Sequence, residues 1–227
     1  MSFRSFYIIL IALSLSLFSC NSKEKEIKDK SDSDSVSNTV KSTVSIQNIL
    51  FFGTSLTAGY GLDLGEGYPE LIQHKLDSLK LPYKAINGGL SGETSAAGKA
   101  RIDWLLKQPV SIFVLELGAN DGLRGVPVKE TTANLQAIID KVTAKYPKAK
   151  LMMTGMEVPP NMGDKYASDF RNMFKTLAQK NQMTFLPFLL EGVAGIPKLN
   201  QNDGIHPTAA GQIIVAENVW SKLQPLL

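Results

Sequence analysis

Two short polar motifs of this sequence hold side chains that together could catalyse acyl transfer. Ser55 directly follows an apolar stretch, and Asp203 precedes His206 by three residues. In such a group the serine hydroxyl attacks a carbonyl carbon, the histidine takes the serine proton, and the carboxylate orients the histidine. Each motif also has an ordinary structural interpretation, because serine often caps a helix and aspartate often accepts hydrogen bonds within a turn. The motifs therefore predict a catalytic site only if the fold brings them together.

Two glycine-rich motifs could supply the hydrogen-bond donors that acyl transfer needs. Asn120 lies within residues 118–122, at the end of an apolar stretch, and its amide could donate to a developing oxyanion. Gly92 lies within residues 87–94, where glycines let backbone N–H groups approach a substrate closely. Taken alone, each motif is more typical of an ordinary turn than of a catalytic site. The four motifs together supply a nucleophile, two donors and an oriented base, and this combination favours a hydrolytic site.

Alternating strand and helix patterns place these motifs at one edge of a predicted sheet. Short apolar runs predict strands at residues 49–52, 111–115 and 151–153, and weaker ones at 83–86 and 184–186. Amphipathic stretches predict helices at residues 68–79, 94–107, 166–179 and 209–223, and around Leu135, Ile138, Ile139 and Val142. The alternation predicts a three-layer α/β/α domain with a parallel sheet between helices. Ligands bind at the carboxyl ends of the strands in such sheets, so we expect the motifs to meet there.

The beginning of the chain has the pattern of a secretion signal. A basic start, an apolar run over residues 6–18 and a small residue after it predict a signal peptide at residues 1–19. The sequence Leu17-Phe18-Ser19-Cys20 resembles the bacterial lipobox, in which the cysteine is lipidated and becomes the mature N-terminus. A simple signal peptide with an incidental cysteine is the alternative. Lipidation of Cys20 would make the protein a membrane-anchored lipoprotein of the cell envelope, on the periplasmic or outer-membrane face.

A change of composition after the signal predicts where the folded domain begins. Residues 20–46 are rich in Ser, Lys, Asp and Glu and contain no aromatic side chain, so they cannot bury enough apolar surface to fold. We expect them to form a flexible linker, and residues 47–227 to form the domain. The net charge of +3 includes no basic stripe, which argues against nucleic-acid binding, and the single cysteine excludes an internal disulfide. No metal-ligand cluster or phosphate-binding loop suggests a cofactor.

The order and sequence of the four motifs closely resemble the SGNH (GDSL-type) hydrolase family, named for its Ser, Gly, Asn and His blocks. The likeness covers residues 49–226 and is most specific at residues 115–125 and 203–207. It is closest to bacterial thioesterase I/lysophospholipase-like esterases and to arylesterases. The resemblance implies a flavodoxin-like fold and a serine esterase without cofactor. It also implies roles for the motif residues, as follows: Ser55 as nucleophile, His206 as base, Asp203 as its orienting carboxylate, and the Ser55 N–H, the Gly92 N–H and the Asn120 side chain as the oxyanion hole.

One residue departs from the family pattern. Thr54 stands where the first block of the family usually has aspartate. That aspartate is not the acid of the triad, so we expect the chemistry to survive. The Thr54 hydroxyl can still bond to local backbone groups.

Two segments are predicted to contact the substrate, which we expect to be a small-molecule or lipid ester. The first is the stretch Glu157, Val158, Pro159 and Pro160, and the second is the loop at residues 188–201. The apolar side chains of the second segment could line an acyl-chain groove or could close the core; they are Phe188, Leu189, Leu190, Val193 and Ile196. A carbohydrate acetyl ester would suit the same chemistry. A catalytically inactive lipoprotein that binds glycans or lipids is the alternative from a different class.

Overall fold

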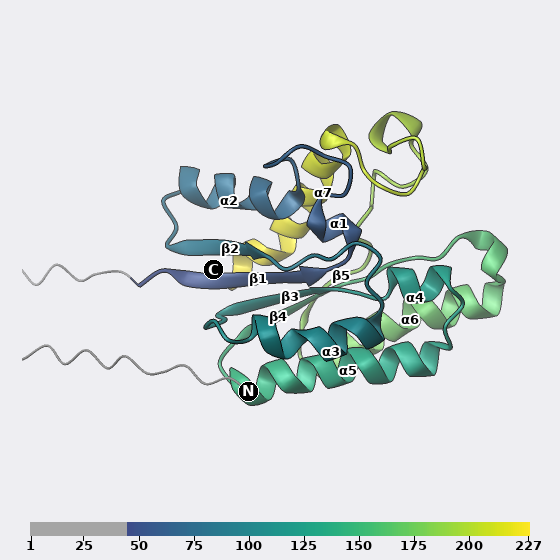
Figure 1. Ribbon diagram of the computed structural model, residues 1–227, viewed down its shortest axis with the longest axis horizontal. Coiled ribbons are helices and arrows are strands. Elements are labelled where there is room, and N and C mark those ends of the chain that lie inside the picture. The colour runs from purple at the N-terminus through teal and green to yellow at the C-terminus, as the bar shows by residue number, and fades with distance from the viewer. Residues whose placement is uncertain (1–44) are drawn as a thin grey trace, which may run out of the picture. The chain divides into compact units, whose positions relative to one another are not determined.

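The computed structural model describes residues 45–227, which fold around a five-stranded sheet (Figure 1). The strands are β1 (Gln47–Gly53), β2 (Tyr83–Asn87), β3 (Ile112–Glu116), β4 (Lys150–Thr154) and β5 (Thr184–Leu186). Their spatial order is β2-β1-β3-β4-β5, and every neighbouring pair is parallel. This is the strand order of flavodoxin-like folds, in which ligands bind where the order reverses, between β1 and β3.

Helices cover both faces of the sheet (Figure 1). One face carries α1 (Ser55–Ala58), α2 (Tyr68–Ser78) and α7 (Ala209–Leu223). The other face carries α3 (Ser95–Leu105), α4 (Ala119–Leu123), α5 (Val128–Lys145) and α6 (Asp164–Lys180). Short 3-10 turns lie at Pro160–Met162, Pro197–Leu199 and Gln224–Leu226. The predicted three-layer α/β/α fold is therefore confirmed.

The central strands are mostly apolar, as strands that helices cover on both faces usually are. All residues of β3 are buried, and β1 is buried from Ile49 onward. On α5, the predicted apolar face is almost completely removed from solvent; it consists of Leu135, Ile138, Ile139 and Val142. Burying a side chain of this size contributes about 1.5–3 kcal/mol to the stability of the fold. The buried parts of β1 and β3 therefore give their carboxyl ends a rigid base.

The helices and strands predicted from apolar periodicity are present, with ends that differ by a few residues. The expectation that the motifs of Ser55 and Asn120 lie in loops at the strand ends is wrong, because α1 and α4 form there. These helices have four and five residues, which is too short for a 3.6-residue periodicity to be visible in the sequence. As a result, Ser55 begins α1, and Asn120 lies in α4 rather than in a loop.

The predicted signal peptide at residues 1–19, Cys20 and the linker as far as residue 44 lie outside the described residues. Among residues 45–227, no helix combines the length and the apolar character that crossing a membrane requires.

Candidate active site

Ser55 is presented by the sharp turn that leads from β1 into α1. The N-cap of α1 is Thr54, whose hydroxyl accepts a 3.4 Å hydrogen bond from the N–H of Leu56. Ser55 follows as the first helical residue at the carboxyl edge of the sheet. Because the first N–H groups of a helix have no partner within the helix, the backbone here can bind negative charge.

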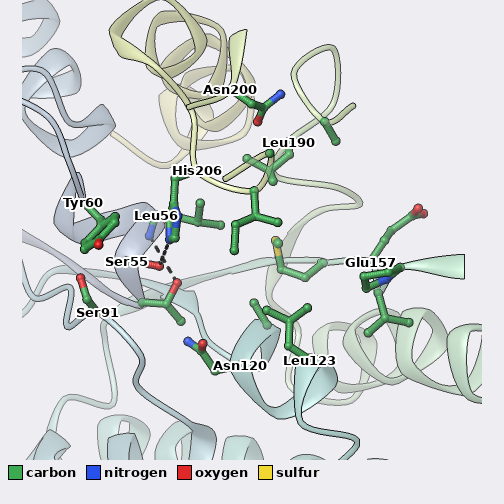
Figure 2. Close-up of a pocket in the computed structure, with 18 of the residues that line it drawn as sticks. Ser55, Leu56, Tyr60, Ser91, Asn120, Leu123, Glu157, Leu190, Asn200 and His206 are labelled. Carbon is green, nitrogen blue, oxygen red and sulfur yellow. Dashed lines mark hydrogen bonds between the residues drawn. The ribbon is translucent and has the colours of Figure 1, made fainter. Parts of the chain in front are cut away.

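The structure brings Ser55, His206 and Asp203 into one hydrogen-bonded chain, of which Figure 2 shows the contact between Ser55 and His206. The Ser55 Oγ lies 2.8 Å from the Nε2 of His206, and the Nδ1 of His206 lies 2.7 Å from the Oδ2 of Asp203. The loop before α7 thus reaches back to the serine from 151 positions away in sequence. In this arrangement, a neutral His206 with its proton on Nδ1 can accept the serine proton at Nε2.

The Asp203 carboxylate is held in its charged form by the loop around it. Its Oδ1 accepts hydrogen bonds of 3.0 Å from the N–H groups of Ile205 and His206. Together with the His206 ring, these donors lower the pKa of Asp203 to about 2, with the Ile205 N–H as the largest cause. Asp203 is therefore ionised at neutral pH and can hold the histidine in one tautomer.

Tyr60 and Gln201 support the histidine, a role that no sequence pattern indicated for either residue. The Tyr60 ring centroid lies 4.7 Å from that of His206, with 43° between the ring planes. Gln201 joins the two loops: its backbone N–H donates to the His206 carbonyl oxygen at 2.7 Å, and its Nε2 donates to the Tyr60 carbonyl oxygen at 2.7 Å. The motif carrying His206 is thus tied to the loop after α1, a contact that no local sequence pattern reveals.

Three donors line the cavity beside the Ser55 hydroxyl. In the part of the chain that the structure describes, neither the Ser55 N–H nor the Gly92 N–H donates to another protein group. The Nδ2 of Asn120 donates to the Glu93 carbonyl oxygen at 3.1 Å, which orients the amide and leaves its second hydrogen available. Figure 2 shows Asn120 and His206 on opposite sides of Ser55. A carbonyl oxygen bound here would face N–H groups in the manner of an oxyanion hole.

The Asp121 carboxylate connects the elements that carry these donors. Asp121 is buried in α4, and its carboxylate accepts from the N–H of Ser95 at 2.8 Å and from the Ser95 hydroxyl at 2.6 Å. These bonds attach the start of α3, which follows the Gly92 loop, to the helix that carries Asn120. The Gly92 carbonyl oxygen also accepts from Arg124 at 3.2 Å.

A cavity of about 760 Å³ extends from Ser55 and has largely apolar walls (Figure 2). This volume lies within the range of small-molecule sites. Of the predicted substrate-contacting residues, Glu157, Val158 and Pro159 line the cavity; the side chain of Pro160 lies outside the described part. Within residues 45–227, no three His, Cys, Asp or Glu side chains gather so as to hold a metal ion.

The loop that starts at Phe188 divides its apolar side chains between the cavity and the core. Phe188 and Leu190 line the cavity, whereas Leu189 and Val193 are fully buried in the core. The loop thus contributes to the cavity wall and to the core through different residues. Leu190 and Leu123 face each other across the cavity between Ser55 and Glu157 (Figure 2).

Glu116 is a buried acid beneath the site that sequence reasoning missed. It ends β3 with no exposed surface, and it accepts from the Thr54 N–H at 2.8 Å and from the Thr54 hydroxyl at 3.0 Å. The Thr54 hydroxyl thus bonds to a side chain as well as to the local backbone. Burial raises the pKa of the Glu116 carboxyl to about 7 against the opposing effect of these hydrogen bonds. A charged residue within the apolar run of residues 112–117 was the available signal.

The sequence and the fold of this chain are similar to those of known proteins. Residues 51–213 match the GDSL-like lipase/acylhydrolase family. Esterase TesA of Pseudomonas aeruginosa is 39% identical over 80% of this chain and 90% of its own length. Thioesterase 1/protease 1/lysophospholipase L1 of Escherichia coli (strain K12) is 37% identical over 79% of this chain and 84% of its own. The crystal structure of TesA superposes with a TM-score of 0.76, at 39% identity, over 80% of this chain and 100% of that one.

Proposed function

This chain belongs to the GDSL-like lipase/acylhydrolase family and is a serine esterase, and from that premise we propose that Ser55, His206 and Asp203 are its catalytic triad. The observation that carries the proposal is the continuous hydrogen-bonded chain from the Ser55 Oγ through the His206 ring to the Asp203 carboxylate. It opens onto a cavity large enough for a small-molecule ester.

The reaction proceeds by two acyl transfers. The Ser55 Oγ attacks the ester carbonyl carbon while the His206 Nε2 takes the serine proton. The tetrahedral intermediate collapses, the bond to the alcohol or thiol breaks, and His206 returns the proton to that leaving group. Water, deprotonated by His206, then attacks the acyl-enzyme, and Ser55 regains its proton as the acid is released.

The oxyanion of each intermediate is held by the Ser55 N–H, the Gly92 N–H and the Asn120 side chain. Asn120 is already oriented by its bond to the Glu93 carbonyl oxygen. The donors therefore need little reorganisation when negative charge develops, which is the main source of rate in such sites.

The cavity walls favour an acyl chain over a sugar as the group that fills it. Apolar side chains make up most of the walls, and polar side chains lie around Ser55 and, at Glu157 and Asn200, farther from it. Burying apolar chain atoms against such walls contributes roughly 0.8 kcal/mol per methylene group, whereas sugar hydroxyls would lose their hydrogen bonds to water there. We therefore favour acyl esters, including lipid esters, over carbohydrate acetyl esters.

Hydrolysis of p-nitrophenyl esters from acetate to palmitate tests both activity and chain length. We expect kcat/KM to rise with chain length beyond acetate, and Ser55→Ala to remove the activity on every ester. Wild type no faster than Ser55→Ala on all esters would show that the catalytic proposal is wrong and would leave the inactive binding protein as the better description. A rate that is highest for acetate would favour the carbohydrate acetyl ester.

We also propose that Cys20 is lipidated and anchors the protein to a membrane of the cell envelope. The support is the lipobox-like sequence of residues 17–20 together with the polar, lysine- and serine-rich stretch after it. The single cysteine follows the apolar run after one small residue, Ser19, which is the position of the lipidated cysteine in a lipobox.

Fractionation of the producing cells tests the anchor. Wild type should sediment with membranes and take up labelled palmitate, and Cys20→Ser should be soluble and unlabelled. Membrane attachment of Cys20→Ser equal to that of wild type would contradict the proposal, independently of esterase activity.

A further inference from the structure

The helix that presents Ser55 is too short to hold its own shape. α1 has four residues, whereas isolated helices shorter than about 12–15 residues are marginal in water. A shift of about 1 Å in a nucleophile can cost roughly 10²-fold in rate. The rigidity of α1 must therefore come from side chains of other elements.

Glu116 supplies the densest set of such contacts. Its Oε2 accepts from the Thr54 N–H at 2.8 Å and from the Thr57 hydroxyl at 2.8 Å. Its Oε1 accepts from the Thr54 hydroxyl at 3.0 Å. The donors come from the residue before Ser55 and from the residue two positions after it, so one carboxylate holds the turn on both sides of the serine.

The strand pairing explains how a side chain of β3 reaches this turn. Gly53 lies directly opposite Glu116 in the pairing of β1 with β3. A Cβ atom at Gly53 would lie 2.4 Å from the Glu116 Oε2 and 2.1 Å from the Thr57 Oγ1, so any other residue would displace the contact. Because Gly53 has no side chain, the Glu116 side chain can extend from β3 past β1 to contact α1.

Two more buried side chains complete the support around the turn. The Tyr68 hydroxyl lies 2.7 Å from the Thr57 Oγ1, and Tyr68 has no exposed surface. Gln212 on α7 accepts from the Tyr68 N–H at 3.1 Å and donates to the Leu56 carbonyl oxygen at 3.2 Å. Glu116 itself does not line the cavity, so it can act on catalysis only through the turn.

We propose that Glu116 is a positioning residue that fixes the nucleophile turn through Thr54 and Thr57, a role that rests on the proposed function of Ser55. The N–H would donate from any residue at position 54, but the Thr54 hydroxyl adds a second donor to the carboxylate, which the family's usual aspartate could supply only when protonated. An aspartate in its place would bring two acids together and force one of them to hold a proton.

Two substitutions of Glu116 and one control separate positioning from stability. Glu116→Leu keeps most of the volume but removes every acceptor, so we expect kcat to fall roughly 10²-fold, with KM within about twofold of wild type. Glu116→Gln should restore kcat to within about fivefold, because its oxygen can accept from the Thr54 N–H and the Thr57 hydroxyl while its NH₂ donates to the Thr54 hydroxyl. Thr154→Val, at the buried carboxyl end of neighbouring β4, should leave kcat unchanged.

The rate at which a p-nitrophenyl phosphonate labels Ser55 gives a second readout. It should fall in parallel with kcat in Glu116→Leu, since it reports the reactivity of the serine rather than substrate binding. Should Glu116→Leu fail to fold, Thr57→Val carries the same test with a smaller expected loss of about tenfold in kcat.

These measurements distinguish failure of the positioning role of Glu116 from failure of the proposed catalytic function of Ser55. A folded Glu116→Leu with wild-type kcat and labelling rate would overturn the positioning role, and so would a loss of kcat that Thr154→Val matches. A wild type no faster than Ser55→Ala would instead remove the catalytic proposal on which this one rests.

Discussion

Asp203 makes two kinds of bond, and the combination determines which nitrogen of His206 carries the proton. One oxygen accepts from the backbone N–H groups of Ile205 and His206, and the other faces the His206 Nδ1. The backbone bonds hold the carboxylate in place, so the ring has to present Nδ1–H to it. The Nε2 lone pair is then directed at the Ser55 hydroxyl.

Asp203→Asn should therefore inactivate the enzyme without unfolding it. The amide oxygen can keep the backbone bonds, which turns the NH₂ toward Nδ1 and places the ring proton on Nε2. We expect kcat to fall roughly 10³–10⁴-fold. Steady-state kinetics on p-nitrophenyl butyrate measures this, with the exposed Asp169→Asn on α6 as control. Activity within tenfold of wild type would mean that Asp203 does not set the tautomer.

Asn120→Ala should lower kcat rather than raise KM. The substitution removes one of the three proposed oxyanion donors, and the loss of one such donor typically costs about 10²–10³ in kcat. The same ester assay measures it, with Asn172→Ala on the outer face of α6 as control. A raised KM with kcat unchanged would instead assign Asn120 to ground-state binding.

The site residues that could be predicted from sequence are those whose role is indicated by residues close to them in the chain. Asp203 and His206 lie three positions apart, and Ser55 and Asn120 each follow a recognisable buried strand. Tyr60 and Glu116 act on residues that are distant in sequence, through packing between elements. No periodicity or spacing within one segment encodes such a contact.

At the scale of elements, the site depends on close contact between two turns at the carboxyl edge of the sheet. The loop after β2 passes against the end of α1, and its Gly89 packs directly on backbone atoms. Asn87 adds a hydrogen bond of 2.9 Å from its Nδ2 to the Thr57 carbonyl oxygen. The strands that position these turns were predictable from apolar runs, but α1 and α4 were not, because each spans little more than one helical turn.

Gly89→Ala tests this contact. The added Cβ would lie 2.3 Å from the backbone N and 2.8 Å from the Cα of Ala58, and backbone cannot give way as a flexible side chain can. We expect a loss of about 1–3 kcal/mol in the free energy of unfolding, as is usual for overpacking, and a fall in kcat because α1 carries Ser55. Urea unfolding and ester kinetics measure the two effects. A variant as stable and as active as wild type would show that the loop is free to move away.

At the scale of the whole molecule, the domain follows the general rule for parallel sheets, with a rigid apolar core below and a polar site above the reversal between β1 and β3. Glu116 is the exception, since it places a carboxyl group inside the core. Its titratable neighbour Tyr68, reached through Thr57, has a pKa raised well above 10 by burial and stays neutral. The carboxyl group of Glu116 is thus the part of this network that titrates near neutral pH.

The position of Glu116 makes stability depend on pH in a direction opposite to that of most carboxylates. Its pKa is about 7 in the folded protein against an ordinary value of 4.5, so below pH 4.5 the group is protonated in both states and folding loses nothing. As pH rises from 4.5 through 7, the unfolded chain ionises first, and the folded state loses up to about 3 kcal/mol relative to it.

Glu116→Gln cannot ionise, so urea unfolding at pH 5, 6, 7 and 8 should show the variant gaining stability relative to wild type with each step. Comparing the two proteins at each pH cancels the contribution of Asp203, whose lowered pKa acts in the opposite direction. A difference between the two proteins that stays constant from pH 5 to pH 8 would mean that Glu116 is ionised throughout that range.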